Sequence, residues 1–178
     1  MTRILDDRSI DSLFRAAHPY RHWLDKPVSD AMIEAIWELA KLPPTGSGIR
    51  PARFVFVKSA AAKAKLAPAF AAAESGAVIA APVSAVIGYD VRLYPTPATS
   101  ADALRDGTLQ AGYLLLAARA IGLDCTPLVP VTPALIDAAF FADGSARTNF
   151  VCLIGHGDPA ATAASEAGPD FAASCRIV

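Results

Sequence analysis

Cysteine and surplus charge are both scarce in this sequence, and long apolar runs are missing. Its three cysteines are odd in number and far apart, which favours reduced thiols in a cytoplasm over a disulfide framework. The formal net charge of −1 argues against a nucleic-acid-binding protein, because such a protein normally carries a basic patch. No apolar window reaches the roughly 18 residues needed to cross a bilayer, and the charged start MTRILDDRSID lacks the apolar core of a signal peptide. We therefore expect a cytoplasmic protein without a membrane span.

Motifs for two common nucleotide-binding folds are also missing. The sequence contains no Gly-x-Gly-x-x-Gly, so a Rossmann dehydrogenase is not supported. The Gly-Ser-Gly at residues 46–48 does not qualify as a P-loop, because a strand rather than a helix is predicted after it. His18 and His22 are four residues apart, but Pro19 keeps His18 out of a regular helix with His22. The sequence therefore predicts no metal site, and its acidic residues form no paired-carboxylate pattern.

Apolar residues, by contrast, are abundant and make up 53% of the chain. A chain of 178 residues suits one domain, spanning residues 1–178, with a sizeable core. An apolar chain with so little net charge often buries surplus apolar surface between two copies. A homodimer is therefore expected.

Hydrophobic periodicity and capping residues predict the secondary structure. The predicted helices cover residues 11–17, 31–42, 60–73, 101–121 and 133–140. The predicted strands cover residues 53–58, 83–89 and 150–155, and residues 125–133 are expected to be extended. Ser29 is the expected N-cap of the second helix, residues 74–76 end the third, Gly122 ends the fourth, and Pro133 begins the fifth. This order of elements indicates an α+β layered domain.

The most informative segment is the loop within residues 41–59, between a predicted helix and a predicted strand. Prolines at positions 43, 44 and 51 restrict the backbone, so this loop is expected to be stiff. Gly46 and Gly48 would let the backbone approach a ligand, and Thr45 and Ser47 offer hydroxyl groups there. Such a loop can clamp a planar cofactor. The alternative is a connection that only turns the chain, and the spacing does not decide between the two.

Seven segments, in order along nearly the whole chain, carry a resemblance to a known family. They are WLDKPVSD at 23–30, PARFVFVKS at 51–59, AAPVSAVIGYD at 80–90, LQAGYLLLAARAIGLDC at 109–125, DAAFF at 137–141, NFVCLIGHGDP at 149–159 and CRIV at 175–178. With these segments the chain resembles the nitroreductase family of flavin mononucleotide (FMN) enzymes. Within that family it is most similar to the malonic semialdehyde reductase and 3-hydroxypropionate dehydrogenase-like branch. The resemblance implies a central, mostly antiparallel sheet flanked by helices.

The resemblance also implies a cofactor and an activity. Members of the family are homodimers with two flavin sites across the subunit interface, so FMN held by residues of both subunits is expected. NAD(P)H would be the electron donor, and ping-pong hydride transfer would reduce a small electron-poor substrate such as a semialdehyde, an enone or a nitro compound. No catalytic side chain is expected, because the cofactor does the chemistry.

Candidate cofactor-binding residues follow from the same resemblance. The sequence AHPYRHW at 17–23 corresponds to a basic and hydroxyl cluster of the family, and Leu128 and Val129 correspond to backbone that passes beside the flavin ring. The candidates are His18, Tyr20, Arg21, Pro44, Thr45, Gly46, Ser47, Gly48, Leu128 and Val129. Arg21 could anchor the flavin phosphate, or it could pair with Asp25 on the surface.

Several positions depart from the family pattern. Gly48 stands where the loop usually has asparagine, and Glu74 and Ala77 stand where an asparagine and a lysine are common. The C-terminal stretch is shortened to ASEAGPDF at 164–171, and only Arg176 remains near the end. These departures support an alternative function. In it the protein is a dimer of the same fold that has lost tight flavin binding and acts as a binding or accessory protein.

Overall fold

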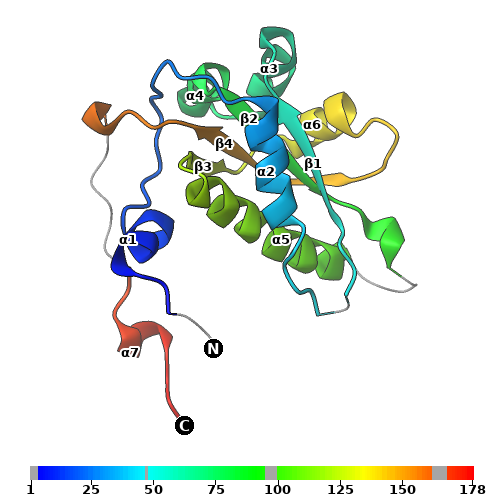
Figure 1. Cartoon of the computed structure of the whole chain (residues 1–178). Coiled ribbons are helices and arrows are strands. Elements are labelled where there is room, and N and C mark those ends of the chain that lie inside the picture. Colours follow the sequence, from blue (N-terminus) through cyan, green and yellow to red (C-terminus); the bar gives the residue numbers. More distant parts are fainter. Residues whose placement is uncertain (1–3, 47, 95–99, 162–167) are drawn as a thin grey trace.

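The computed structural model describes residues 4–46, 48–94, 100–161 and 168–178 (Figure 1). Its helices are α1 (Asp7–Ile10), α2 (Asp30–Ala40), α3 (Ala60–Leu66), α4 (Ala72–Ala80), α5 (Ser100–Ala120), α6 (Pro133–Phe140) and α7 (Phe171–Ser174). Its strands are β1 (Ala52–Val57), β2 (Val83–Tyr89), β3 (Asp124–Leu128) and β4 (Arg147–Gly155). One turn of π-helix, Asp11–Arg15, continues α1.

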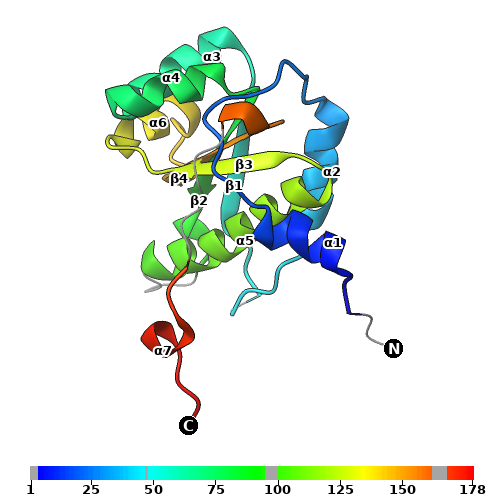
Figure 2. The ribbon, with the colours of Figure 1, turned by 90° about the vertical axis from the view of Figure 1, so that its left-hand side faces the viewer.

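The four strands form one antiparallel sheet between two layers of helices. The strand order is β1-β2-β4-β3, so β2 and β4 are central and β1 and β3 lie at opposite edges. Helices α2 and α5 cover one face, and α3, α4 and α6 cover the other (Figures 1 and 2). The predicted α+β fold with an antiparallel sheet flanked by helices is therefore confirmed.

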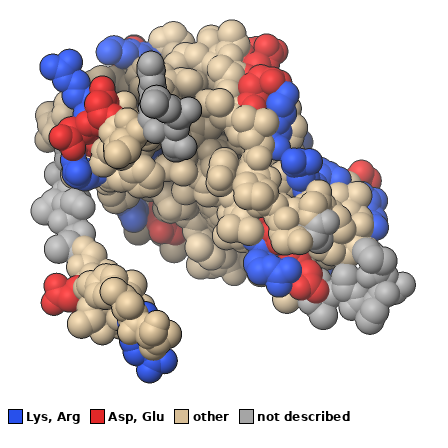
Figure 3. Space-filling model, turned by 60° about the horizontal axis from the view of Figure 1, so that its bottom comes forward, with Lys and Arg blue, Asp and Glu red and all other residues tan. Residues whose placement is uncertain are grey.

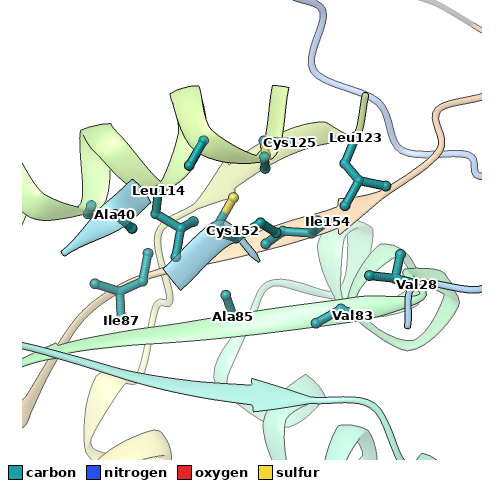
Figure 4. Packing of buried hydrophobic residues seen from close by; sticks show 14 residues of the cluster. Val28, Ala40, Val83, Ala85, Ile87, Leu114, Leu123, Cys125, Cys152 and Ile154 are labelled. Atoms are coloured by element: carbon teal, nitrogen blue, oxygen red, sulfur yellow. The ribbon is translucent and has the colours of Figure 1, made fainter. Parts of the chain in front are cut away.

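Alternating side chains of the central strands divide the core between the two faces. Val83 and Ile87 of β2 and Ile154 of β4 point toward α2 and α5 (Figure 4). Val86 and Leu153, from the same two strands, pack against the layer of α3, α4 and α6. Because a strand turns successive side chains to opposite faces, a strand covered on both sides needs a continuous apolar run. That requirement explains why the sequences of β2 and β4 are apolar throughout their central parts.

The residues predicted to bound the second, fourth and fifth helices act as expected. The Ser29 hydroxyl accepts a hydrogen bond from the Met32 N–H at 3.2 Å and caps the N-terminus of α2. Gly122 follows α5 with φ of 82°, a left-handed conformation that disfavours other residues. Pro133 is the first residue of α6, where its missing N–H costs nothing.

The helix predicted at residues 60–73 is wrong in its extent. The structure has α3, a turn of 3₁₀-helix at Ala67–Ala69 and then α4, and residues 74–76 lie inside α4 instead of ending a helix. Pro68 has no N–H to continue the hydrogen bonds of α3, and the chain tightens into the 3₁₀ turn there. The change brings Glu74 to the first turn of α4.

A fourth strand, β3, overlaps the segment at residues 125–133 that was predicted only as extended. Pro127 is part of this strand, opposite Cys152 of β4. Proline is compatible with an edge strand, where the missing N–H can face away from the neighbouring strand. The boundaries of other elements also differ: β4 begins at Arg147, the first helix begins at Asp7, and α2, β1 and α5 are offset by one or two residues.

Candidate functional site

The segment between α1 and α2 is attached to the edge of the sheet that β3 forms (Figure 2). The Thr126 hydroxyl donates a hydrogen bond to the carbonyl of Tyr20 at 2.7 Å. Trp23 forms a β-bridge with Gly157, and the Asp158 N–H donates to the carbonyl of His22 at 3.0 Å. These contacts, made by backbone groups of the segment, hold Arg21 beside β3.

A hollow of about 470 Å³ lies between this segment, α4 and the end of β3. Its walls are Pro19, Arg21, His22, Glu74, Thr126, Pro127, Leu128, Val129 and Ala161. We call it the Arg21 pocket. Val129 is 73% exposed, so the pocket offers an aliphatic wall next to the main chain of β3. An apolar wall with a few polar groups is typical of sites that bind planar ligands.

The charged groups of the Arg21 pocket face each other. Nη2 of Arg21 lies 3.9 Å from Oε1 of Glu74, and the two side chains are 53% and 27% exposed. At that separation the contact is an ion pair without a hydrogen bond, and an exposed pair of this kind contributes little to stability. The expected alternative partner, Asp25, does not form this ion pair; Glu74 does.

Three of the predicted site residues line the Arg21 pocket, and two more lie close behind it. Arg21, Leu128 and Val129 are in its wall. Tyr20 contacts the wall through its carbonyl, which accepts from Thr126, and His18 touches the edge of the Tyr20 ring at a centroid distance of 6.3 Å. The ring nitrogen Nδ1 of His18 is buried, and His18 is not part of the pocket wall.

The loop within residues 41–59, which was predicted to clamp a cofactor, lies far from the Arg21 pocket of the same chain. Its residues Pro44, Thr45, Gly46 and Gly48 precede β1, which is the sheet edge opposite to β3. Leu128 is level with Val55 across the sheet, so three strand spacings, about 14 Å, separate β1 from the pocket edge. The loop lies beyond Ala52, about 10 Å further along β1. One chain therefore does not bring the loop and the Arg21 pocket together.

The loop has an internal structure of its own. The Thr45 hydroxyl donates to the carbonyl of Ile49 at 2.6 Å, and the Gly48 N–H donates to the carbonyl of Thr45 at 3.2 Å. Gly48 has φ of 74°, which explains the glycine there, whereas Gly46 has no positive φ and open space around it. Ser47 lies outside the described residues.

An apolar groove runs along the outer side of α5. It is lined by Ala101, Leu104, Arg105, Thr108, Leu109, Gly112, Tyr113 and Leu116. Leu109 is 48% exposed and Tyr113 is 41% exposed. Figure 3 looks at the lower side of Figure 1, where α5 lies, and charged side chains are sparse across its centre. We call this surface the α5 groove.

Two of the three cysteines are shielded from solvent. All three are free thiols, and Cys125 and Cys152 are buried in the core between α5 and the sheet (Figure 4). Burial raises the pKa of the Cys152 thiol well above its ordinary value, so it stays protonated and weakly nucleophilic. In the described part of the chain, no three His, Cys, Asp or Glu side chains gather closely enough for a metal ion. None of the described helices is both long and apolar enough to cross a membrane.

Comparisons with known proteins place the chain. Residues 15–80 match the model of the nitroreductase family. A protein of Stenotrophomonas maltophilia, Smlt0482, provisionally named NADH dehydrogenase/NAD(P)H nitroreductase, is 43% identical over 178 residues, covering 90% of this chain and 91% of that protein. The chain belongs to the nitroreductase family. The predicted family, and with it an oxidoreductase, is thereby confirmed, while the malonic semialdehyde branch stays a prediction.

A second relative supports the same family assignment. HadB of Ralstonia pickettii, with the same provisional name, is 44% identical over 172 residues, or 85% of this chain and 88% of that protein. Solved structures share the fold at low identity. CLA-ER, described as an enone reductase, has a TM-score of 0.84 at 16% identity and covers 98% of this chain and 100% of its own. A provisionally named nitroreductase from Desulfovibrio desulfuricans, solved in complex with FMN, has a TM-score of 0.78 at 18% identity, covering 98% of this chain and 99% of its own.

Sequence reasoning missed several wall residues of the Arg21 pocket. Thr126 and His22 were not among the candidates, and Glu74 was noted only as a departure from the family pattern. The signal for Thr126 was present, because it is a polar residue near the start of a mostly apolar extended segment that follows a capped helix. Glu74 gave no such signal, since its place in the wall depends on where α4 packs.

Proposed function

We propose that the protein is an FMN-dependent NAD(P)H oxidoreductase, built from one domain and working as a homodimer in the cytoplasm. Its substrate would be a small electron-poor compound such as a semialdehyde, an enone or a nitro compound. The observation that carries the proposal is the Arg21 pocket, which combines an arginine with an aliphatic, partly main-chain wall. The provisional names of the relatives and the FMN complex of a structural neighbour support it.

The residue types in the wall of the Arg21 pocket are suited to bind a flavin. Leu128 and Val129 offer aliphatic surface and main-chain groups of the sort that hold a planar ring, and Arg21 is a cation suited to a phosphate. When bound, FMN would supply hydride transfer between NAD(P)H and the substrate. The chain's own contribution would be binding: the segment anchored to Thr126 fixes Arg21, and the exposed Val129 leaves room beside the ring.

A second protomer would complete the site. The loop with Thr45 and Gly48 lies about 17 Å or more from the Arg21 pocket of its own chain, so in the proposed dimer it would serve the pocket of the partner. The α5 groove gives an apolar surface for the contact, and both views show the loop emerging on the α5 side of the molecule (Figures 1 and 2). The C-terminal segment projects away from the sheet with Ile177 and Val178 almost fully exposed, and a second copy would cover it.

Flavin titration of the purified protein tests the proposal. FMN should bind with quenched fluorescence, and the complex should oxidise NADH or NADPH under air. Arg21→Ala should weaken FMN binding by at least about tenfold, because a charge-assisted contact to phosphate is worth about 1.5–3 kcal/mol. Arg147→Ala removes an exposed arginine at the far end of β4 and should leave the dissociation constant unchanged. Equal binding by the two variants would remove Arg21 from the site.

The second candidate function is the dimeric binding or accessory protein without tight flavin binding. The observation that favours it is Glu74, because a carboxylate facing Arg21 opposes an anionic cofactor. A folded dimer that neither quenches FMN fluorescence nor oxidises NAD(P)H would support this candidate over the first.

A further inference from the structure

Gln110 is a polar side chain buried between α5 and the sheet. It is 1% exposed, and its Oε1 accepts a hydrogen bond from the Ala52 N–H at 2.9 Å. Ala52 is the first residue of β1, so this contact joins α5 to the end of the loop that contains Thr45 and Gly48. A buried amide is unfavourable unless it is hydrogen-bonded, and so is a buried N–H without an acceptor. Gln110 therefore links the helix to the loop.

The end of the loop is held at a second point beside Gln110. The carbonyl of Pro51 accepts a hydrogen bond from the Asp90 N–H at 2.9 Å. Gly107 lies about one turn before Gln110 in α5. A Cβ atom on Gly107 would lie 3.2 Å from Cβ of Tyr89 and 3.9 Å from Cγ of Pro51, so the glycine lets the helix approach the sheet here. These contacts fix the position of the loop end relative to α5.

The same helix carries the surface proposed for the dimer. Leu109 and Tyr113 of the α5 groove are partly exposed, whereas Gln110 is buried and faces β1. Contact between two copies through the groove would therefore place α5, and with it the loop, at a set position on the partner. The loop lies about 17 Å or more from the Arg21 pocket of its own chain, so in the proposed dimer the pocket that it serves is the partner's.

We propose that Gln110 is a positioning residue for the flavin site of the partner subunit. It fastens the loop to the helix that carries the dimer contact, and it does not itself line the Arg21 pocket. The inference rests on the proposed function, because it assumes a dimer that binds a flavin. It adds that a change in the core of one subunit alters flavin binding in the other.

FMN titration of Gln110→Met, followed by flavin fluorescence, is the first test. Methionine has a similar size but offers the Ala52 N–H no comparable acceptor, so the dissociation constant of FMN should rise about two- to tenfold, the effect of one lost neutral hydrogen bond. Ile136→Val is the control, because it removes a buried methylene under α6, away from the loop and the pocket. It should lower the midpoint of thermal unfolding and leave the dissociation constant unchanged.

Mixed dimers show on which subunit Gln110 acts. Two chains with different affinity tags are co-expressed, and the mixed dimer is purified on both tags. If one chain carries Arg21→Ala and the other carries Gln110→Met, both defects fall on the same site, and the second site should bind FMN with wild-type affinity. If one chain carries both changes and the other is wild type, each site has one defect. The tighter site should then have the affinity of the Gln110→Met homodimer.

The opposite pattern, with wild-type affinity only in the second mixed dimer, would overturn the proposal. Unchanged FMN binding by the Gln110→Met homodimer or a monomeric wild type would also overturn it. If the wild type does not bind FMN, the proposed function itself falls, and this inference with it. If Gln110→Met does not fold, Gln110→Ala takes its place in both tests. The smaller side chain leaves room for a water molecule on the Ala52 N–H, while the link to α5 is still lost.

Discussion

Gly157 is the residue whose replacement probes most directly how the Arg21 pocket is held. A Cβ atom at this position would lie 2.3 Å from Cγ of Tyr20 and 2.5 Å from both of its Cδ atoms. Non-bonded carbon atoms prefer about 3.5–4.0 Å, so Gly157→Ala would have to push the ring away by about 1 Å or more. The ring has little freedom to yield, because it also meets His18 and Trp23, at centroid distances of 6.3 and 6.5 Å.

The expected cost of Gly157→Ala is that of overpacking, about 1–3 kcal/mol. For a chain of this size each kcal/mol lowers the midpoint of thermal unfolding by about 2–4 °C, so a decrease of about 2–12 °C is expected. Because Tyr20 precedes Arg21 in the chain, FMN binding should weaken as well. Circular dichroism during heating and FMN titration at a temperature well below both midpoints measure the two effects separately.

Gly76→Ala is the matched control, because the space around Gly76 in α4 is open. It should leave the midpoint unchanged or raise it slightly, since alanine is favoured over glycine inside a helix. If Gly157→Ala unfolded at the same temperature as the wild type, the close packing of Tyr20 on Gly157 would be refuted. The account of how the segment is held would then be wrong.

Two further predictions concern acid stability and assembly. Hydrogen bonds from Arg92 hold the pKa of the buried Asp90 carboxyl below its ordinary 3.8, so this carboxylate stabilises the fold above that pH and its contribution is lost as pH falls through the lowered pKa. In urea titrations Asp90→Asn should lower the free energy of unfolding by about 1.5–3 kcal/mol at pH 7. This deficit should shrink as the pH falls below 3.8 and disappear only below the lowered pKa of Asp90. Leu109→Glu places a charge in the α5 groove and should raise the dissociation constant of the proposed dimer at least about 100-fold in light scattering. Leu135→Glu, on the similarly exposed surface of α6, should leave the dissociation constant of the dimer unchanged. If the dimer tolerates both changes, the α5 groove is excluded as the interface.

Local sequence signals were sufficient for many of the secondary-structure elements. The apolar runs of β1, β2 and β4, the cap at Ser29 and the left-handed Gly122 depend on residues within a few positions of one another. The break between α3 and α4 was missed because an alanine-rich stretch is helical on either side of Pro68. Strand β3 was missed because Pro127 within it and the prolines that follow it argue against a strand, while its pairing with β4 is a long-range interaction.

The sequence by itself determined the family, the α+β composition and the identity of Arg21, Leu128 and Val129 as candidate site residues. Tertiary structure alone decided which of these residues meet. It placed Glu74 opposite Arg21 and put the loop containing Thr45 at the opposite edge of the sheet. The physical reason is that strand order and helix packing, which determine these distances, arise from contacts between residues far apart in the chain, and residue spacing does not contain that information.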